Sequence, residues 1–326
     1  MKKFLPSFKT LSFFILGVIT GAAIHNNQDL LKDYVARGVM WWSMPDFRWT
    51  MVNVNHTTLQ GDAHLIQIRD GQTILIDAGY EQPAKEKLMP WLKQNYVKQI
   101  DRVFISHPHR DHYEGLFQIV KSGIRVKEVY FHVPDRALCD AESPRCVYQS
   151  VLDMKALLEN RKIPLLEVEN GQELDLGGGA LMRVLNVSDA IHTPIGPTNK
   201  INDMSMVLQL EFAGHKILFT GDLGEKMGQY VAETSDQLKS EILKVPHHGG
   251  RSLVPNVFFD KVSPEYSLVP APAWLWCDER ADQARNWHKN HHIPVYVNGF
   301  HGHIQVIIHH ARLSFNTEIP PSPMCE

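Results

Sequence analysis

The densest group of chemically versatile side chains is the segment HPHRDH at residues 107–112, with three histidines and one aspartate in six residues. Imidazole nitrogens and carboxylate oxygens are the usual protein ligands of zinc and similar divalent metals. Alternate residues of an extended segment point to the same side, so His107 and His109 can face one ion. Asp111 and His112 can then turn toward a second ion about 3.5–4 Å away, the usual spacing of two-metal sites. The segment therefore predicts a site for two metals.

Aspartate and histidine also follow three other apolar segments that are typical of β-strands. TILID ends at Asp77, KILFT leads through a glycine into Asp222, and EILKV leads through a proline into His247 and His248. The segment HPHRDH itself follows the apolar strand RVFIS. Rigid strands that deliver ligands into one cleft give a site its positional accuracy. Asp222 alone would be interpreted as a turn residue, but together with the histidine segment it is predicted to be a ligand.

The elements that must position these residues begin near residue 48, where short strands alternate with turns. Segments 49–55, 63–69 and 72–77 predict successive strands, with Asp70-Gly71 as a two-residue hairpin turn. Further strands are predicted at 102–106, 206–212, 216–220, 241–245, 295–298 and 303–308, and helices at 83–95, 225–233 and 281–289. Strands dominate both halves and no internal repeat is visible. Two packed sheets with helices outside are therefore expected.

The motifs HPHRDH, Asp77, Asp222 and His247, in this order and setting, resemble the metallo-β-lactamase superfamily over about residues 48 to 310. Further details resemble the hydrolase domain of DNA-uptake competence proteins of the ComEC type. They are QGDAHLI (60–66) before GQTILIDAG (71–79), NDMS (202–205), LFTGD (218–222) and LKVPHHGGRS (243–252). The resemblance implies an α+β fold, a four-layer αββα sandwich with two similar halves and a metal site at one edge.

The resemblance also implies two metal positions that share one bridging carboxylate. The implied ligands are His107 and His109 for the first ion, Asp111, His112 and His247 for the second, and Asp222 for both. His248 can take the place of His247 as the ligand, and the sequence leaves this choice open. Asp77 would hold ligand imidazoles in place by hydrogen bonds. The predicted cofactor is a pair of divalent ions, zinc first and manganese as the alternative.

One position departs from the pattern of many superfamily members. They supply a third histidine to the first metal about 20 residues before the bridging aspartate, where this chain has Asn202-Asp203-x-Ser205. His192, thirty residues before Asp222, can substitute if its loop folds inward. An oxygen ligand at this position would favour a harder ion such as manganese over zinc.

The predicted chemistry is metal-assisted hydrolysis by a metal-bridging hydroxide that forms at physiological pH. The residues predicted to act in catalysis are Asp77, Asp111 and His248. His248 would protonate the leaving group, or His247 would do so if His248 is the ligand. His301, in a glycine-rich turn late in the domain, is a further candidate for lining the cleft.

Three classes of function fit these residues. The leading prediction is a phosphodiesterase or nuclease that acts on DNA or another phosphodiester outside the cytoplasm. The alternatives are a hydrolase of an envelope ester, lactone or other small substrate, and a non-catalytic metal-containing binding module. A net charge of −3 argues against avid DNA binding, although Arg110, Lys200 and Arg251 can form a local patch. Oligomeric state is not predicted.

The N-terminus indicates export. Lys2, Lys3 and Lys9 precede an uncharged run from Leu11 to Ile24, which is shorter than the about 20 residues of a spanning helix. Residues 1–24 are therefore predicted to be a signal peptide or an N-terminal membrane anchor, and the protein to be periplasmic, secreted or anchored. The further boundaries are a connector at 25–47, a metallo-β-lactamase-fold hydrolase domain at 48–315 and a tail at 316–326.

Four cysteines, an even number, fit an oxidising compartment. Cys139 and Cys146 flank the short loop CDAESPRC and can close it, which leaves Cys277 and Cys325 as a second pair. Three pairings are possible in principle. None of the cysteines has the CxxC spacing of a metal or redox motif, so they are interpreted as structural.

Overall fold

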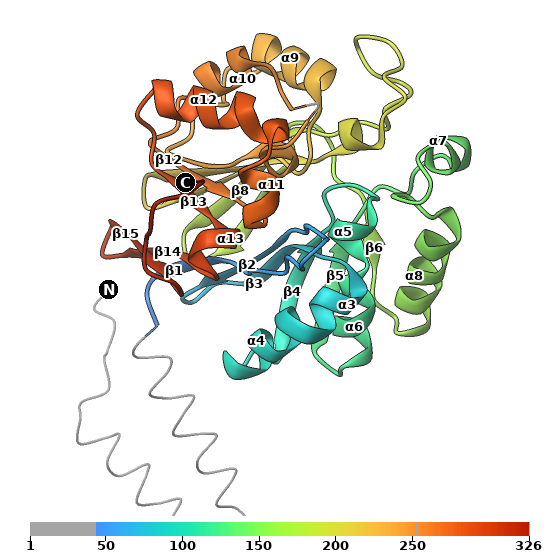
Figure 1. Cartoon of the computed structure of the whole chain (residues 1–326). Coiled ribbons are helices and arrows are strands. Elements are labelled where there is room, and N and C mark those ends of the chain that lie inside the picture. The colour runs from blue at the N-terminus through green and yellow to red at the C-terminus, as the bar shows by residue number, and fades with distance from the viewer. Residues whose placement is uncertain (1–43, 252, 326) are drawn as a thin grey trace, which may run out of the picture. The chain divides into compact units, whose positions relative to one another are not determined.

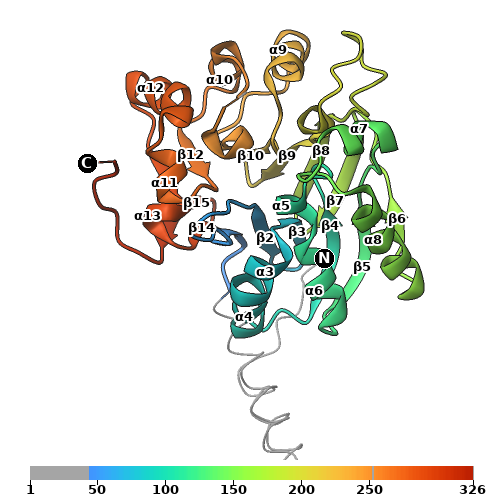
Figure 2. The ribbon, with the colours of Figure 1, turned by 45° about the vertical axis from the view of Figure 1, so that its right-hand side comes forward.

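Two β-sheets packed face to face form the centre of the computed structural model, which describes residues 44–251 and 253–325 (Figure 1). Helices cover the outer face of each sheet, and a turned view shows the same layering (Figure 2). The predicted signal peptide or anchor at 1–24, and the connector up to residue 43, lie outside the described residues. Within the described ranges, no helix is long and apolar enough to cross a bilayer.

The first sheet has the strand order β15-β14-β1-β2-β3-β4-β5-β6. Its strands are β1 (Phe47–Met51), β2 (Ala63–Ile68), β3 (Thr73–Ala78), β4 (Gln99–Phe104), β5 (Arg125–Tyr130), β6 (Leu165–Leu166), β14 (Ile304–His309) and β15 (Arg312–Thr317). β3, β4, β5 and β6 run parallel to one another, whereas the other neighbouring pairs are antiparallel. The parallel strands β3 and β4 therefore end at the same edge of the sheet.

The second sheet has the order β13-β12-β11-β10-β9-β8-β7. Its strands are β7 (Glu173–Gly177), β8 (Ala180–Asn186), β9 (Val207–Phe212), β10 (His215–Phe219), β11 (Ile242–Lys244), β12 (Tyr266–Val269) and β13 (Val295–Val297). The strands from β10 to β13 are parallel, and the rest are antiparallel. The carboxyl ends of β10, β11 and β12 therefore also meet at one edge.

Both faces of the central strands are apolar, which explains the four layers. In β3, Ile74 and Ile76 belong to the core between the sheets, whereas Leu75 packs under the helices of the first half. In β10, Phe219 faces the core between the sheets and Leu218 faces the helices of the second half. Because successive strand residues point to opposite faces, such continuous apolar runs require cover on both sides.

The outer layers consist of short helices. In the first half they are α3 (Glu81–Pro83), the π-helical turn η1 (Ala84–Leu88), α4 (Met89–Gln94), α5 (Arg110–Tyr113), α6 (Gly115–Lys121), α7 (Arg136–Ala141) and α8 (Tyr148–Asn160). Later come the 3-10 turns η2 (Ile201–Met204), η3 (Pro246–Gly249) and η4 (Glu279–Ala281), with α9 (Glu225–Thr234), α10 (Asn256–Val262), α11 (Ala273–Trp276), α12 (Asp282–Asn290) and α13 (Asn298–His301).

The predicted four-layer sandwich is confirmed, and every predicted strand overlaps an observed one. The predicted hairpin between β2 and β3 forms, with Asp70 in the left-handed region at φ 59°. The predicted tail at 316–326 begins inside β15, which ends at Thr317. The cysteines pair as Cys139–Cys146 and Cys277–Cys325, so that the second disulfide joins this tail to the residue after α11.

Candidate metal centre

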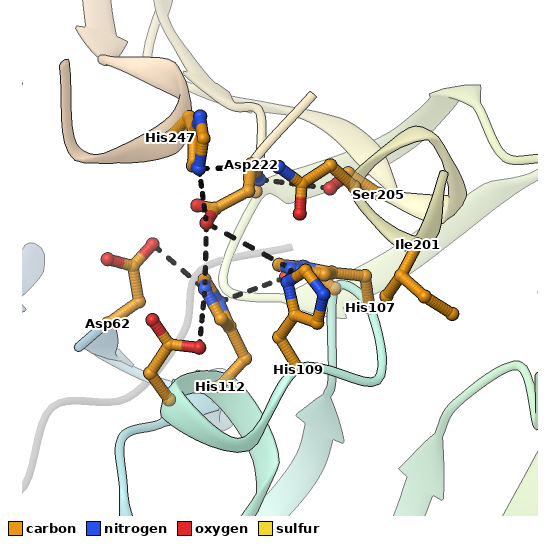
Figure 3. A network of polar contacts seen from close by, with 12 residues as sticks. Asp62, His107, His109, His112, Ile201, Ser205, Asp222 and His247 are labelled. Atoms are coloured by element: carbon orange, nitrogen blue, oxygen red, sulfur yellow. Dashed lines mark hydrogen bonds and ion pairs between the residues drawn. The ribbon is translucent and has the colours of Figure 1, made fainter. Parts of the chain in front are cut away.

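One carboxylate oxygen lies at the centre of the histidine cluster. Oδ2 of Asp222 has imidazole Nε2 atoms around it at 3.3 Å (His112), 3.4 Å (His248), 4.0 Å (His107) and 4.0 Å (His247). Figure 3 shows the Asp222 carboxylate between residues of both sheets. Asp222 follows β10 in the second sheet, whereas His107 and His112 follow β4 in the first. The sandwich therefore brings its two halves together at this oxygen.

The side chains around Asp222 form two overlapping groups with the composition of metal sites. They are His107, His109 and Asp222 in one group, and Asp111, His112, Asp222 and His248 in the other. In each group the candidate ligand atoms lie within 4.8 Å of one another, and every member is buried. Nε2 of His112 and Nε2 of His248 have no hydrogen-bond partner among the described residues. Buried polar atoms are normally paired, so these donor sets fit two ions that share Asp222.

Asp77 fixes the orientation of His112. Oδ2 of Asp77 lies 2.8 Å from Nδ1 of His112 and accepts a 2.8 Å hydrogen bond from the hydroxyl of Ser106. Its other oxygen accepts from the backbone N–H of Ser106 at 2.7 Å. A carboxylate on Nδ1 holds the ring with a proton on that nitrogen, which directs Nε2 toward Asp222 and leaves it as the nitrogen that can bind an ion. Asp77 thus fastens the end of β3 to the end of β4.

Asp62, just before β2, stands in the same relation to His248. Nδ1 of His248 lies 3.1 Å from Oδ1 of Asp62 and 2.9 Å from the carbonyl oxygen of Pro270. Oδ2 of Asp62 lies 2.5 Å from Nζ of Lys244, and both side chains are buried. We did not predict a role for either residue. The available signals were the position of Asp62 in the QGDAHLI motif and the presence of Lys244 in the apolar strand EILKV, because lysine is rarely buried.

The backbone that carries Asp222 is held by the NDMS segment and by Lys244. Oγ of Ser205 accepts from the backbone N–H of Asp222 at 2.9 Å, and the Gly221 carbonyl accepts from Nζ of Lys244 at 2.6 Å. Gly221 has φ 51°, and a Cβ there would come within 2.8 Å of Oγ of Ser205. A glycine is therefore required immediately before Asp222.

The carboxylates and imidazoles of the site shift one another's pKa values in opposite directions. Burial acts to raise the pKa of Asp222, but His248 and His112 hold it well below its ordinary value. Burial acts to lower the pKa of His112 and of His248, yet Asp222 raises both well above the ordinary value, with Asp77 assisting at His112 and Asp62 at His248. Without an ion, protonated imidazoles supply the positive charge that the carboxylates require. This is the behaviour expected of a site that binds cations.

The geometry distinguishes the adjacent His247 and His248, whose roles the sequence left open. His248 belongs to the second group of candidate ligands and is buried, whereas 19% of the His247 side chain is exposed. Nε2 of His247 lies 3.3 Å from the amide nitrogen of Asn202 and 4.0 Å from Oδ2 of Asp222. Both residues have left-handed backbone angles, and their two ring planes are tilted by 48° to each other. The structure thus favours His248 as the ligand and puts His247 at the rim.

The structure does not bring the other predicted residues into the cluster. His192 is 84% exposed, and its Nδ1 lies 2.7 Å from Asp189, whose carboxylate also closes the turn by accepting from the backbone of Ile191 and His192. The expectation that His192 substitutes for the third histidine is therefore not supported. His301 is buried in α13, with Nδ1 3.0 Å from the backbone of Val297. Asp203 is buried too, and burial raises its pKa.

Glu142 is a further residue that the sequence did not single out. Its Oε2 lies 3.1 Å from Nε2 of His109. Burial acts to raise the pKa of Glu142, but the hydrogen bonds from His109 and from the backbone of Ile201 lower it to about 2. Its position inside the cysteine-flanked loop CDAESPRC was the available signal.

Comparisons with known proteins agree with this geometry. A family model for the Metallo-beta-lactamase superfamily matches residues 56–271. The chain is 23% identical over 241 residues to "ComE operon protein 3" of Bacillus subtilis (strain 168), covering 65% of this chain and 28% of that protein. It is 25% identical over 201 residues to "Competence protein ComA" of Neisseria gonorrhoeae, covering 60% of this chain and 23% of that protein. The matches thus span about a quarter of the length of these relatives.

A solved structure supports the fold. CmlA, a diiron β-hydroxylase from Streptomyces venezuelae, superposes with a TM-score of 0.51 at 14% identity, covering 81% of this chain and 54% of that chain. At this identity the similarity concerns the fold alone. The fold and the ligand groups around Asp222 therefore agree with the family match.

Proposed function

Because the chain belongs to the metallo-β-lactamase superfamily, whose members are generally metal-dependent hydrolases, we propose that it hydrolyses phosphodiesters with two divalent ions. The observation that carries the proposal is the Asp222 carboxylate, which is shared by two buried groups of ligand side chains. His107, His109 and Asp222 would hold one ion, and Asp111, His112, His248 and Asp222 the other. Zinc is the first candidate for both positions and manganese the second.

Two bound ions would supply a nucleophilic water at neutral pH and stabilise the negative charge that develops on the phosphate. The chain's own residues hold that arrangement in place. Asp77 and Asp62 keep the Nε2 atoms of His112 and His248 directed toward Asp222. His247, which lies at the rim beside Asn202, would give a proton to the leaving oxygen.

A hollow beside Arg110 offers room for a substrate. Its volume is about 390 Å³, and its lining includes Leu59, Tyr80 and Arg110. Gln60 reaches from the same side to Asp111, with Nε2 3.3 Å from Oδ2. Arg110 directly precedes Asp111 in the chain, whereas none of the residues that line the hollow belongs to the two ligand groups. The Arg110 guanidinium lies 5.7 Å from the Tyr80 ring centre, so it offers both a charge and a stacking surface at the opening.

DNA is the leading candidate among phosphodiesters. The relative from Neisseria gonorrhoeae is named a competence protein, and the motifs at 60–79 and 243–252 resemble DNA-uptake competence proteins. Export is part of the proposal, with the protein periplasmic, secreted or anchored through residues 1–24. The basic start and apolar run of this segment support it, as do the two disulfides.

A small ester or lactone is the second candidate substrate, and the charges near the site favour it. Two of the cations expected to form a DNA-binding patch are paired with carboxylates, Arg110 with Glu114 at 2.5 Å and Arg251 with Glu279 at 2.6 Å. Such pairing reduces the positive potential that a nucleic acid would meet.

The test is a cleavage assay on purified protein whose metal content has been measured. Single- and double-stranded DNA, bis(p-nitrophenyl) phosphate and a phenyl ester are each incubated with zinc or manganese, beside an Asp222→Ala variant. Metal-dependent cleavage of a phosphodiester that the variant lacks supports the proposal. Cleavage of the ester alone would favour the second candidate, a small ester or lactone, as the substrate. Two bound ions without turnover of any substrate would indicate a binding module and overturn the proposal.

A further inference from the structure

His109 is held by a carboxylate from a different part of the chain. Its Nε2 donates to Oε2 of Glu142 at 3.1 Å, while its Nδ1 lies 3.1 Å from Nε2 of His107. The side chains of His109 and Glu142 are 4% and 8% exposed, so water competes little for this hydrogen bond. Because Nε2 is committed to Glu142, Nδ1 is the nitrogen of His109 that remains for the first metal position.

Glu142 also joins this histidine to the segment where the third histidine is missing. Its Oε1 accepts from the backbone N–H of Ile201 at 2.9 Å, at the start of η2, and Asn202 in η2 contacts His247. Figure 3 shows His109 and Ile201 on the same side of Asp222. One carboxylate thus connects the HPHRDH segment with η2. The first position has only His107, His109 and Asp222 as donors in the described cluster, so the orientation of His109 matters more there.

A disulfide holds the loop that carries Glu142. Cys139 lies in α7 and Cys146 follows seven residues later, and both are buried. Inside the loop the backbone N–H of Glu142 donates to the Cys139 carbonyl at 3.0 Å, and the Arg145 carbonyl accepts from the backbone N–H of Arg110 at 3.0 Å. The loop is therefore fastened to the residue after His109. A disulfide limits the conformations open to such a loop, and its loss would free Glu142 to leave His109.

We propose that Glu142 is a positioning residue for the first metal position, and that the Cys139–Cys146 disulfide keeps it in place. Filling of this position then depends on the redox state of a disulfide whose cysteines bind no metal. The proposal rests on the metal centre of the proposed function, although not on its substrate. Removal of comparable outer partners of metal-binding histidines lowers metal affinity by about 10- to 100-fold.

The first test measures zinc stoichiometry and affinity by competition with a chromophoric chelator, using the full chain. Glu142→Ala is expected to weaken one of two ions by about 10-fold or more and to leave the other unchanged. Glu142→Gln, whose amide oxygen can still accept from Nε2–H, is expected to retain most of the affinity. Asp189→Ala removes a matched carboxylate–histidine pair on the surface and should have no effect. The absorption spectrum of the cobalt-substituted protein reports the change in coordination independently of activity.

Two results would overturn the positioning role. The first is that the Glu142→Ala variant binds both ions as tightly as the wild type, which would show that Glu142 does not position His109. Equal losses in Glu142→Gln and Glu142→Ala would make Glu142 a direct ligand instead. A wild-type protein that binds fewer than two ions would overturn the metal centre, and with it this proposal. Two ions bound tightly, but no cleavage of phosphodiesters, would refute only the proposed function.

The second test isolates the disulfide. A Cys277→Ser/Cys325→Ser variant retains Cys139–Cys146 as its only disulfide, because the chain has four cysteines. It is expected to bind two ions like the wild type when oxidised. Reduction with a phosphine should weaken one ion by about 10-fold, and reoxidation should restore it. Circular dichroism of both redox states confirms that the fold is retained. If the reduced and folded sample binds both ions with unchanged affinity, the disulfide does not support metal binding.

Discussion

Lys244 and Asp62 form a fully buried ion pair, with Nζ of the lysine 2.5 Å from Oδ2 of the aspartate. Burial acts to lower the pKa of Lys244, but Asp62 and Asp222 raise it above the ordinary value. The same ammonium group donates to the Gly221 carbonyl, and the same aspartate faces His248. The pair therefore connects β11 with the loop before β2, and it contacts the candidate metal centre at two residues, Gly221 and His248.

Removing one partner should cost far more than removing both. Lys244→Met leaves Asp62 buried without its cation and is expected to lower the free energy of unfolding by about 3–5 kcal/mol. Lys244→Met combined with Asp62→Asn should recover much of that loss, because no uncompensated charge remains. Urea denaturation of the two single variants and the double variant measures the coupling. Additive losses would show that the two charges do not depend on each other.

Metal content should separate the two adjacent histidines. His248→Ala removes a buried side chain that lies 3.4 Å from both Asp111 and Asp222, and is expected to release one ion. His247→Ala alters the partly exposed ring at the rim, and should keep both ions while kcat falls by about 100-fold, as expected for a lost general acid. Elemental analysis and steady-state kinetics on both variants decide this. The reverse pattern would restore His247 as the ligand.

Asp77 should act on metal binding through His112. Asp77→Asn removes the charge beside Nδ1 of His112 and is expected to weaken the second ion by about 10- to 100-fold. Asparagine suits the left-handed backbone of this residue, φ 59°, so the fold should survive. Isothermal titration with zinc measures the effect, and Asp101→Asn, outside the cluster, is the control. Equal affinities in both variants would make Asp77 a structural residue only.

The ligands that the sequence predicted share one local feature, which is why they could be found. HPHRDH, Asp222 and the His247–His248 pair each follow an apolar strand, Asp77 lies at the end of one, and parallel strands end at a common edge. The helix α8 was not predicted, although its buried residues Val151, Met154 and Leu158 have the spacing of three and four that is typical of an amphipathic helix.

The supporting residues could not be found in the same way, because their roles depend on tertiary contacts. Asp62 precedes its strand, Lys244 lies inside one, and Glu142 lies in a loop closed by a disulfide. The exposure of His192 depends on such contacts too. The Asp189 carboxylate contacts both the ring and the backbone N–H of His192, and these local contacts hold the histidine side chain in solvent. Spacing from Asp222 alone carries no information about such a turn.

His288 should make stability depend on pH at a point away from the metal centre. It is buried in α12, with Nδ1 2.7 Å from the Ala284 carbonyl and Nε2 2.9 Å from the Ser267 hydroxyl. Burial lowers its pKa from an ordinary 6.5 to about 4. Between these values the unfolded chain binds a proton that the folded chain does not. The stability contributed by neutral His288 is therefore complete above pH 6.5 and is lost as the pH falls toward 4.

His288→Gln removes this titration while retaining a side chain that can bond to Ser267. Between pH 7 and pH 4.5, the wild type should lose on the order of 2–3 kcal/mol more unfolding free energy than the variant. Denaturation in the presence of a chelator measures both proteins without a contribution from metal release. His56→Gln, on the surface, controls for the loss of a histidine and should follow the wild type. Parallel pH profiles for wild type and His288→Gln would mean that His288 is already protonated in the folded protein, or that its cavity admits water.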